Sequence, residues 1–177
     1  IGGHLPGSNT TSFHYPSGVA CNNRGHVIVA DTYNHRVQIF DEKSRFIRTV
    51  RLTGRAGSDN HLLAGPHDVC VDRSNHNQIL VADHSNCRIS IWSADGSQFI
   101  RSIPLDQCPT CLTLDCFDRL VVGCRSRIHV FSAGDFKEIQ VLGDKGPKSS
   151  KFNWIKGICV TDNNTLVVSE SGTCIKM

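Results

Sequence analysis

Residues 29–40 read V-A-D-T-Y-N-H-R-V-Q-I-F, and residues 81–92 read V-A-D-H-S-N-C-R-I-S-I-W. Both stretches contain a short aliphatic strand that ends in Asp, a turn with an Asn and an Arg, and a second strand that ends in an aromatic residue. Upstream, Pro16 and Pro66 each open another short apolar strand, which is followed by a polar turn. The chain is therefore built on an internal repeat, and this repeat decides the fold.

Two weaker copies of the repeat follow. In the third copy, residues 120–124 read L-V-V-G-C in place of the Val-Ala-Asp strand, and residues 127–131 supply the next strand. In the fourth copy, residues 157–160 and 166–170 repeat the first two strands. Equivalent points lie about 40 to 50 residues apart, which is the spacing of propeller blades.

Each copy of the repeat has the residue types that are typical of strands and turns. Short runs of β-branched and apolar residues are bounded by Gly, Asn, Asp and Ser, without helical periodicity of useful length. A fourth strand is expected near residues 46–50 and 98–102. Four antiparallel strands repeated radially make a β-propeller, so the predicted fold is all-β. The predicted blades cover approximately residues 13–55, 63–103, 104–143 and 152–177, the last one truncated.

The stretch from Val29 to Phe40 closely resembles the signature of the NHL repeat family. The match is strong in the first two repeats, recognisable in the fourth and degenerate in the third. The family usually forms about six blades, within the range known for propellers. The resemblance therefore implies that this chain, with about four blades, is a fragment of a longer polypeptide.

The pattern is similar to the C-terminal propellers of tripartite-motif NHL proteins, which carry RING, B-box and coiled-coil segments upstream. Members of this group are often ubiquitin ligases or translational regulators, and their propellers bind proteins or RNA. The resemblance implies first a protein-interaction module that recognises substrates for a RING-type E3 ubiquitin ligase. The alternative is a propeller that binds single-stranded or stem-loop RNA in post-transcriptional regulation. The 177 residues contain no RING or B-box array, so we expect this chain itself not to be an enzyme.

The composition and net charge of the chain exclude few classes of function. The chain is 39% hydrophobic and 20% charged, as in ordinary globular proteins. A net charge of +3 neither requires nor excludes a polyanionic partner. No stretch approaches the roughly 18 apolar residues of a membrane span, so we expect no membrane partner.

The Asp, Asn and Arg of the repeat have the chemistry to hold a turn together. Asp and Asn side chains accept hydrogen bonds from nearby backbone in turns, and Arg pairs with a carboxylate across the turn. A motif that recurs at the same place in successive blades is typical of structural residues. The predicted structural set is Asp31, Asn34, His35, Arg36, Asp83, Asn86 and Arg88.

One face of the predicted blades carries the candidate binding residues. In an antiparallel blade, the loop that enters the first strand and the loop between the second and third strands lie at the same end. Aromatic residues beside amides and bases occur in these loops, and such residues bind single-stranded RNA or a peptide. Phe13 and Trp154 have the alternative of packing between blades. The candidate partner-binding residues are His14, Tyr15, Tyr33, Asn34, His67, Arg125, Ser126, Asn153, Trp154 and Lys156.

The nine cysteines indicate a reduced protein more than a disulfide scaffold. Cys70 and Cys159 fall at the same first-strand position, where a small buried thiol packs as a modest hydrophobe. We therefore expect a cytoplasmic protein. Cys108 and Cys111 have the spacing of zinc ligands, but strand geometry would scatter the other cysteines, and whether this pair binds metal stays open.

A metal-dependent lyase or hydrolase propeller is a distant alternative. Such a site needs His or carboxylate side chains that converge from several blades. His67 and Asp68 of the second repeat have no counterparts in the first, where Ser17 and Gly18 stand. No nucleophile elbow and no zinc-protease helix motif occurs. We therefore predict no catalytic residues, no metal and no cofactor.

Overall fold

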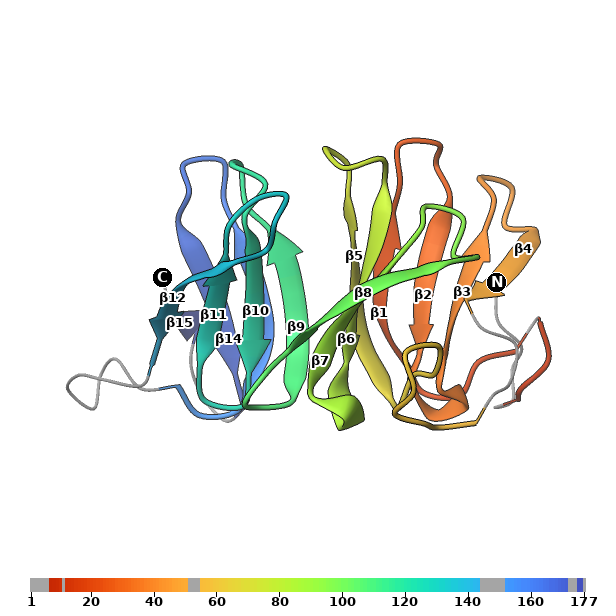
Figure 1. The fold of residues 1–177 in the computed structure, drawn as a ribbon, viewed down its shortest axis with the longest axis horizontal. Helices are drawn as coiled ribbons and strands as arrows, with labels where there is room; N and C mark the ends of the chain where they lie inside the picture. Colours follow the sequence, from red (N-terminus) through yellow and green to blue (C-terminus); the bar gives the residue numbers. More distant parts are fainter. Residues whose placement is uncertain (1–6, 11, 51–54, 144–151, 172–174, 177) are drawn as a thin grey trace. The chain divides into compact units, whose positions relative to one another are not determined.

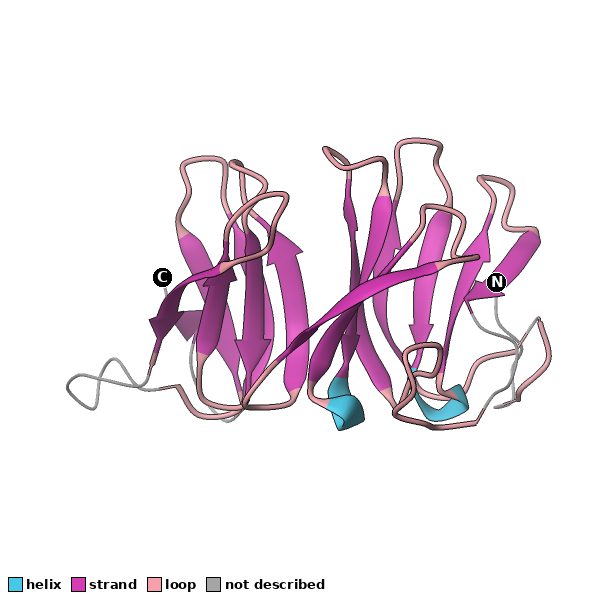
Figure 2. Cartoon of the chain, in the orientation of Figure 1, coloured by secondary structure: helices cyan, strands magenta, loops and turns pink. Residues whose placement is uncertain are grey.

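A computed structural model describes residues 7–10, 12–50, 55–143, 152–171 and 175–176. Its regular structure is almost entirely antiparallel β-sheet (Figure 2). The chain divides into two compact units, residues 1–105 (unit 1) and residues 106–177 (unit 2). Each unit contains two sheets, so the predicted all-β fold of repeated antiparallel sheets is confirmed.

Unit 1 consists of two four-stranded sheets in which each strand pairs with the next along the chain (Figure 1). The first sheet contains β1 (Pro16–Cys21), β2 (Val27–Asp31), β3 (Arg36–Phe40) and β4 (Phe46–Val50). The second contains β5 (Pro66–Asp72), β6 (Gln78–Asp83), β7 (Arg88–Trp92) and β8 (Phe99–Pro104). This simple meander is the connectivity of a propeller blade.

A short 3-10 turn joins the second and third strands of both sheets in unit 1. These turns, η1 (Thr32–Asn34) and η2 (His84–Asn86), each follow the Asp that ends the preceding strand. Each turn ends at a residue with left-handed backbone, His35 at φ 51° or Cys87 at φ 46°. A left-handed residue terminates such a helical turn, and the next strand then pairs back onto the previous one.

Unit 2 repeats this pattern with less sequence likeness. The third sheet contains β9 (Pro109–Leu114), β10 (Leu120–Cys124), β11 (Ile128–Phe131) and β12 (Glu138–Leu142). The fourth sheet is three-stranded and contains β13 (Ile155–Val160), β14 (Leu166–Glu170) and β15 (Ile175–Lys176). In all four sheets the first strand lies at an edge.

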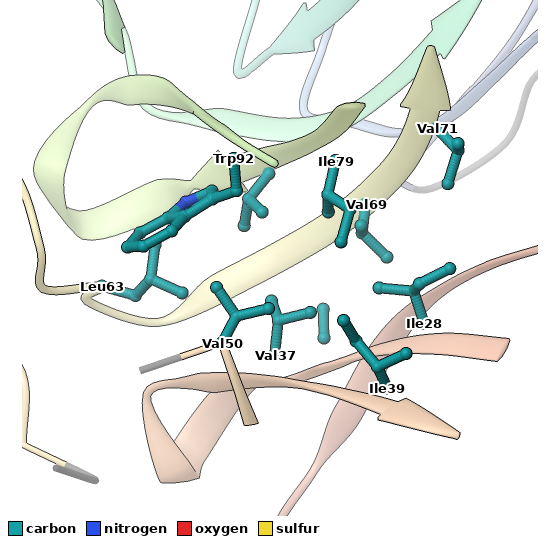
Figure 3. Packing of buried hydrophobic residues seen from close by; sticks show 11 residues of the cluster. Ile28, Val37, Ile39, Val50, Leu63, Val69, Val71, Ile79 and Trp92 are labelled. Atoms are coloured by element: carbon teal, nitrogen blue, oxygen red, sulfur yellow. The ribbon is translucent and has the colours of Figure 1, made fainter. Parts of the chain in front are cut away.

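The hydrophobic core of unit 1 lies between its two sheets (Figure 3). Side chains alternate along a strand, so every second residue of an inner strand faces the neighbouring sheet. The first sheet contributes Ile28, Ala30, Val37, Ile39 and Val50, and the second unit-1 sheet with its leading loop contributes Leu63, Val69, Val71, Ile79, Val81 and Trp92. Burial of one large apolar side chain contributes roughly 1.5 to 3 kcal/mol. Unit 2 has its own core of Cys111, Val121, Ile128, Val130, Ile155 and Val168.

Gly18 lets the first strands of the two unit-1 sheets approach closely. A Cβ atom at this position would lie 2.5 Å from the Cα of Asp68 on β5. Because backbone cannot yield as a flexible side chain does, any larger residue would push β1 and β5 apart. Among the described residues, no helix is long and apolar enough to span a membrane.

Candidate partner-binding site on the loop face

Asp31 anchors the loop that enters β1. Its buried carboxylate accepts hydrogen bonds from the backbone N–H of His14 (2.7 Å), Nδ2 of Asn34 (2.8 Å) and Nε of Arg36 (2.7 Å). The two terminal guanidinium nitrogens of Arg36 donate to the carbonyl oxygens of Ser8, Asn9 and Ser12 at 2.6 to 2.8 Å. A buried ion pair with this many hydrogen bonds is fully satisfied and holds the loop in one place.

The second repeat makes the same network. Asp83 accepts hydrogen bonds from the N–H of Ala64 (2.7 Å), Nδ2 of Asn86 (2.8 Å) and Nε of Arg88 (2.7 Å). Arg88 donates further to the carbonyl oxygens of Ser58, Asp59 and Leu62. The two Asp–Asn–Arg sets therefore position the loops at one end of the strands. We call this end the loop face.

His35 and its neighbours join the two sheets of unit 1 at the loop face. Nδ1 of His35 accepts a hydrogen bond from the N–H of Gly65 (3.0 Å). The hydroxyl of Thr32 donates to the carbonyl oxygen of Pro66 (2.8 Å), and it also contacts the hydroxyl of Ser17 (2.6 Å). Asn34, one of the candidate binding residues, has its amide nitrogen engaged with Asp31 and with the carbonyl of Gly7.

Tyr15 and Tyr33 form an exposed aromatic pair on the loop face of unit 1. Their ring centroids are 4.7 Å apart, and the ring of His14 meets Tyr33 edge-on at 5.1 Å. Tyr15 is 67% exposed and Tyr33 is 56% exposed. The structure thus brings three sequence-predicted residues together from two different loops. Their rings are open to a ligand that stacks on aromatic faces.

His67 stacks on His84, with ring centroids 4.1 Å apart and an interplanar angle of 12°. Partial burial lowers the pKa of His84, and the carboxylate of Asp83 acts in the opposite direction. His67 was a candidate from the sequence, whereas His84 was not. The signal that could have found it is its position directly after Asp83 in the aligned repeat.

Trp154 is the centre of the corresponding surface in unit 2. This residue is 41% exposed. The guanidinium carbon of Arg125 lies 5.0 Å from the ring centroid, and Nζ of Lys156 lies 5.4 Å from it. Both cations are within the range of favourable cation–π interaction. Three candidate residues therefore form one aromatic and cationic cluster.

The weaker repeats replace the Asp of the motif by other side chains. Glu170 accepts a hydrogen bond from the N–H of Asn153 (3.2 Å), as Asp31 does from His14. In the third repeat, Arg127 stands opposite Cys124 and forms an ion pair with Asp106. The repeat pattern does not reveal this pair, because the turn between β10 and β11 is shorter than in the first two repeats. Ser126 is held beside it by the side-chain amide of Gln107 at 3.3 Å.

Two expectations about the cysteines are wrong. Cys159 is exposed rather than buried, because Ile158 and Val160 on either side of it pack against the unit 2 core and its own side chain points to the opposite face of β13. Cys87 and Cys108 are disulfide-bonded, which contradicts the expectation that the cysteines are reduced. The sulfur of Cys108 is therefore not a free thiolate that could bind zinc. Within the described ranges, no group of three His, Cys, Asp or Glu side chains is placed to hold a metal ion.

Cys124 is expected to resist alkylation in the folded chain. Burial raises the pKa of its thiol to about 12, with the nearby carboxylate of Asp106 acting in the same direction. Because the thiolate is the nucleophile, reaction at pH 8 with iodoacetamide should be much slower at Cys124 than at exposed Cys116. Peptide mass spectrometry after a timed reaction measures both rates. Equal rates in the native chain would contradict the burial of Cys124.

The repeat turns and their strands correspond to a known family. The NHL repeat family matches residues 13–40 and 63–92. The chain carries NHL repeats. It is 37% identical over 62% of its length to Protein brain tumor of Drosophila melanogaster, and 59% identical over 19% of its length to B-box type zinc finger protein ncl-1 of Caenorhabditis elegans. Both relatives are tripartite-motif NHL proteins, which confirms the resemblance predicted from the repeats.

These NHL-repeat relatives are much longer than the matched region. The alignments cover 10% of Protein brain tumor and 4% of ncl-1. A third relative, the probable peptidyl-alpha-hydroxyglycine alpha-amidating lyase pgal-1 of Caenorhabditis elegans, is 30% identical over 56% of this chain and 28% of its own length. The activities of these whole proteins therefore do not transfer directly to this chain.

The NHL repeats also share their fold with solved structures. Hydrazine synthase of Kuenenia stuttgartiensis superposes with a TM-score of 0.71 over 97% of this chain and 46% of its own, at 14% identity. At this identity the likeness concerns the fold alone. Together with the four antiparallel sheets, it confirms the predicted NHL-type β-propeller fold class.

Proposed function

We propose that this chain is a partner-binding module that binds single-stranded RNA at the loop face of unit 1 and at the corresponding end of unit 2. The observation that carries the proposal is the backbone conformation of Tyr15 and Trp154. Each of these residues lies directly before the first strand of its sheet. Both have left-handed backbone, with φ of 51° and 56°, at a place where the second repeat has Gly65 at φ 58°. A large side chain in this region costs about 1 to 2 kcal/mol relative to the usual conformations.

Strain and exposure at the same two residues favour a role in binding. Stability would favour glycine here, whereas Tyr15 and Trp154 present large rings to solvent. Strained residues of this kind collect at ligand sites. Stacking of a base on an aromatic ring contributes about 1 to 3 kcal/mol, and it tolerates any base. Arg125 and Lys156 beside Trp154 supply the positive charge that a phosphate backbone requires.

RNA binding is testable by fluorescence anisotropy with a labelled single-stranded oligonucleotide over a range of salt concentrations. Trp154→Ala is expected to weaken binding roughly tenfold, as loss of one stacked base predicts. Arg125→Ala with Lys156→Ala is expected to reduce the slope of log affinity against log salt by about 2. Lys43→Ala with Lys137→Ala is the matched control, because it removes two exposed charges from turns at the other end of the strands. Equal affinity in all these variants would exclude RNA binding at this cluster.

A protein partner is the second candidate, and the Tyr15–Tyr33 pair favours it. Tyrosine is enriched at protein interfaces, where its ring anchors a partner with little loss of side-chain entropy. In a tripartite-motif protein such a surface would recognise substrates for ubiquitination, with any ligase chemistry in other segments. Binding of this kind would fall with Tyr15→Ala plus Tyr33→Ala and would depend weakly on salt.

A further inference from the structure

A second candidate binding site lies in unit 1 at the end of the strands opposite the loop face. A pocket of about 440 Å³ opens there between the first and second sheets. Ile47 and Ile100, both almost half exposed, form part of its apolar wall. Its volume falls within the range of small-molecule sites.

The turns between first and second strands bring hydrogen-bond donors to this pocket. Asn22 caps its own turn, since its Oδ1 accepts the backbone N–H groups of Arg24 and His26 at 2.9 Å each. The side chains of Arg24 and His26 line the pocket, and no hydrogen bond or ion pair engages them within the part of the chain that the structure describes. Donors without partners remain available to a ligand.

The second sheet adds two donors from consecutive left-handed residues. His76 has φ 54° and Asn77 has φ 58°, and both line the pocket. Oδ1 of Asn77 accepts the N–H of Asn23 at 3.4 Å, which joins the two turns and leaves the amide nitrogen as a donor. Left-handed backbone in two adjacent residues is strained, and strain of this kind accompanies ligand sites.

Unit 2 contains the corresponding turn between its first and second strands, and the positive charge of that turn is paired within the turn itself. Asp115 caps its turn as Asn22 does, with its Oδ1 accepting the N–H groups of Phe117 and Arg119 at 2.9 Å each. Its other oxygen accepts Nε of Arg119 at 2.6 Å, so the cation is paired internally. The pocket here is about 150 Å³. The unit 2 turn therefore has a carboxylate where unit 1 has the amide of Asn22, and by position Phe117 corresponds to Arg24 and Arg119 to His26.

One carboxylate, that of Asp95, lies in the lining of the unit 1 pocket. Hydrogen bonds from Ser93 and Ser97 lower the pKa of Asp95 to about 2, so it is ionised at neutral pH. Its Oδ1 accepts from the hydroxyl of Ser93 (2.7 Å) and from the N–H and hydroxyl of Ser97 (3.0 and 2.8 Å). Arg48 is near enough to interact with the same carboxylate.

We propose that this pocket binds a small anionic ligand. Arg24 holds its phosphate or carboxylate group, with His26, His76 and the amide of Asn77 as further donors, and its apolar part lies against Ile47 and Ile100. Guanidinium is the side chain best matched to these two anions, because its N–H groups form paired charge-assisted hydrogen bonds. The site is separate from the loop face and does not depend on the proposed RNA binding.

The test is an NMR titration of the labelled chain with inorganic phosphate and, separately, with succinate. The proposal expects the backbone amides of Arg24, His26 and Asn77 to shift with at least one probe, and the tighter probe identifies the anionic group. Asn22→Asp introduces the carboxylate that unit 2 already uses in the same turn, so the fold should be kept while binding weakens at least about tenfold. Arg24→Gln should have the same effect, since this exposed side chain has no structural partner to lose.

Lys43→Gln is the matched control, because it removes an exposed positive charge of unit 1 that does not line the pocket. It should leave the titration unchanged. If neither probe shifts these three amides, or if Asn22→Asp and Arg24→Gln bind as tightly as the unmodified chain, the proposal is overturned.

Discussion

Replacement of Asp83 by alanine is expected to lower the free energy of unfolding by about 3 to 5 kcal/mol. Asp83 is fully buried and receives the N–H of Ala64, the amide of Asn86 and Nε of Arg88. Without the carboxylate, the guanidinium of Arg88 stays buried with no opposite charge, and the backbone N–H of Ala64 loses its acceptor. Urea unfolding in a Trp154→Phe background, where Trp92 is the remaining one of the two tryptophans, measures the loss in unit 1 by fluorescence.

Two further variants distinguish the loss of the Asp83–Arg88 ion pair from the general effect of removing a carboxylate. Glu42→Ala removes an exposed carboxylate from the same unit and should change stability by less than about 0.5 kcal/mol. Asp83→Ala combined with Arg88→Met should recover part of the loss, because the unpaired buried charge is then gone. If the double variant were less stable than Asp83→Ala alone, the carbonyl contacts of Arg88 would matter more than its charge.

Replacement of Ile79 by alanine should have the next largest effect, a loss of about 2 to 5 kcal/mol. Ile79 is fully buried between the two sheets of unit 1, where it lies among Ile28, Val69 and Trp92 (Figure 3). The loss combines the transfer of its methyl groups to water with the cavity that the truncation leaves.

Ile100→Ala is the matched control for Ile79→Ala. The two isoleucines belong to the same sheet, but Ile100 is 44% exposed. Its truncation leaves no closed cavity, so the loss should stay below about 1 kcal/mol. Comparable losses in both variants, measured by the same urea titration, would contradict the placement of the core between the sheets.

The repeat made much of the fold predictable. Strand alternation, the polar turns and the Asp–Asn–Arg spacing are local features, so residues 29–40 and 81–92 identify strands and turn without any tertiary information. The fourth strand also followed from its apolar run, predicted near 46–50 and observed as Phe46–Val50. The candidate aromatics Tyr15 and Tyr33 could be placed at the loop end of their sheet, and Trp154 at the corresponding end of its own sheet, because an antiparallel meander fixes which loops share an end.

The errors arose where side chains at distant positions meet. Cys159 is exposed although Cys70, at the same position of its repeat, is partly buried, and the aligned sequences do not show this difference in the surroundings of the two strands. Pairing of Arg127 with Asp106 replaces the Asp of the motif by a residue from the preceding loop. The stack of His67 on His84 joins residues that look unrelated in sequence.

By itself, the sequence determined the strands, the turns, the repeat and the end of the sheets on which the candidate ligand residues lie. Each of these depends on spacings of a few residues, over which backbone geometry leaves little choice. Tertiary structure alone decided that Arg36 and Arg88 hold the preceding loops, and that Arg24 and His76 share a pocket. Those contacts join residues tens of positions apart, and their partners are selected by how the sheets pack rather than by any local pattern.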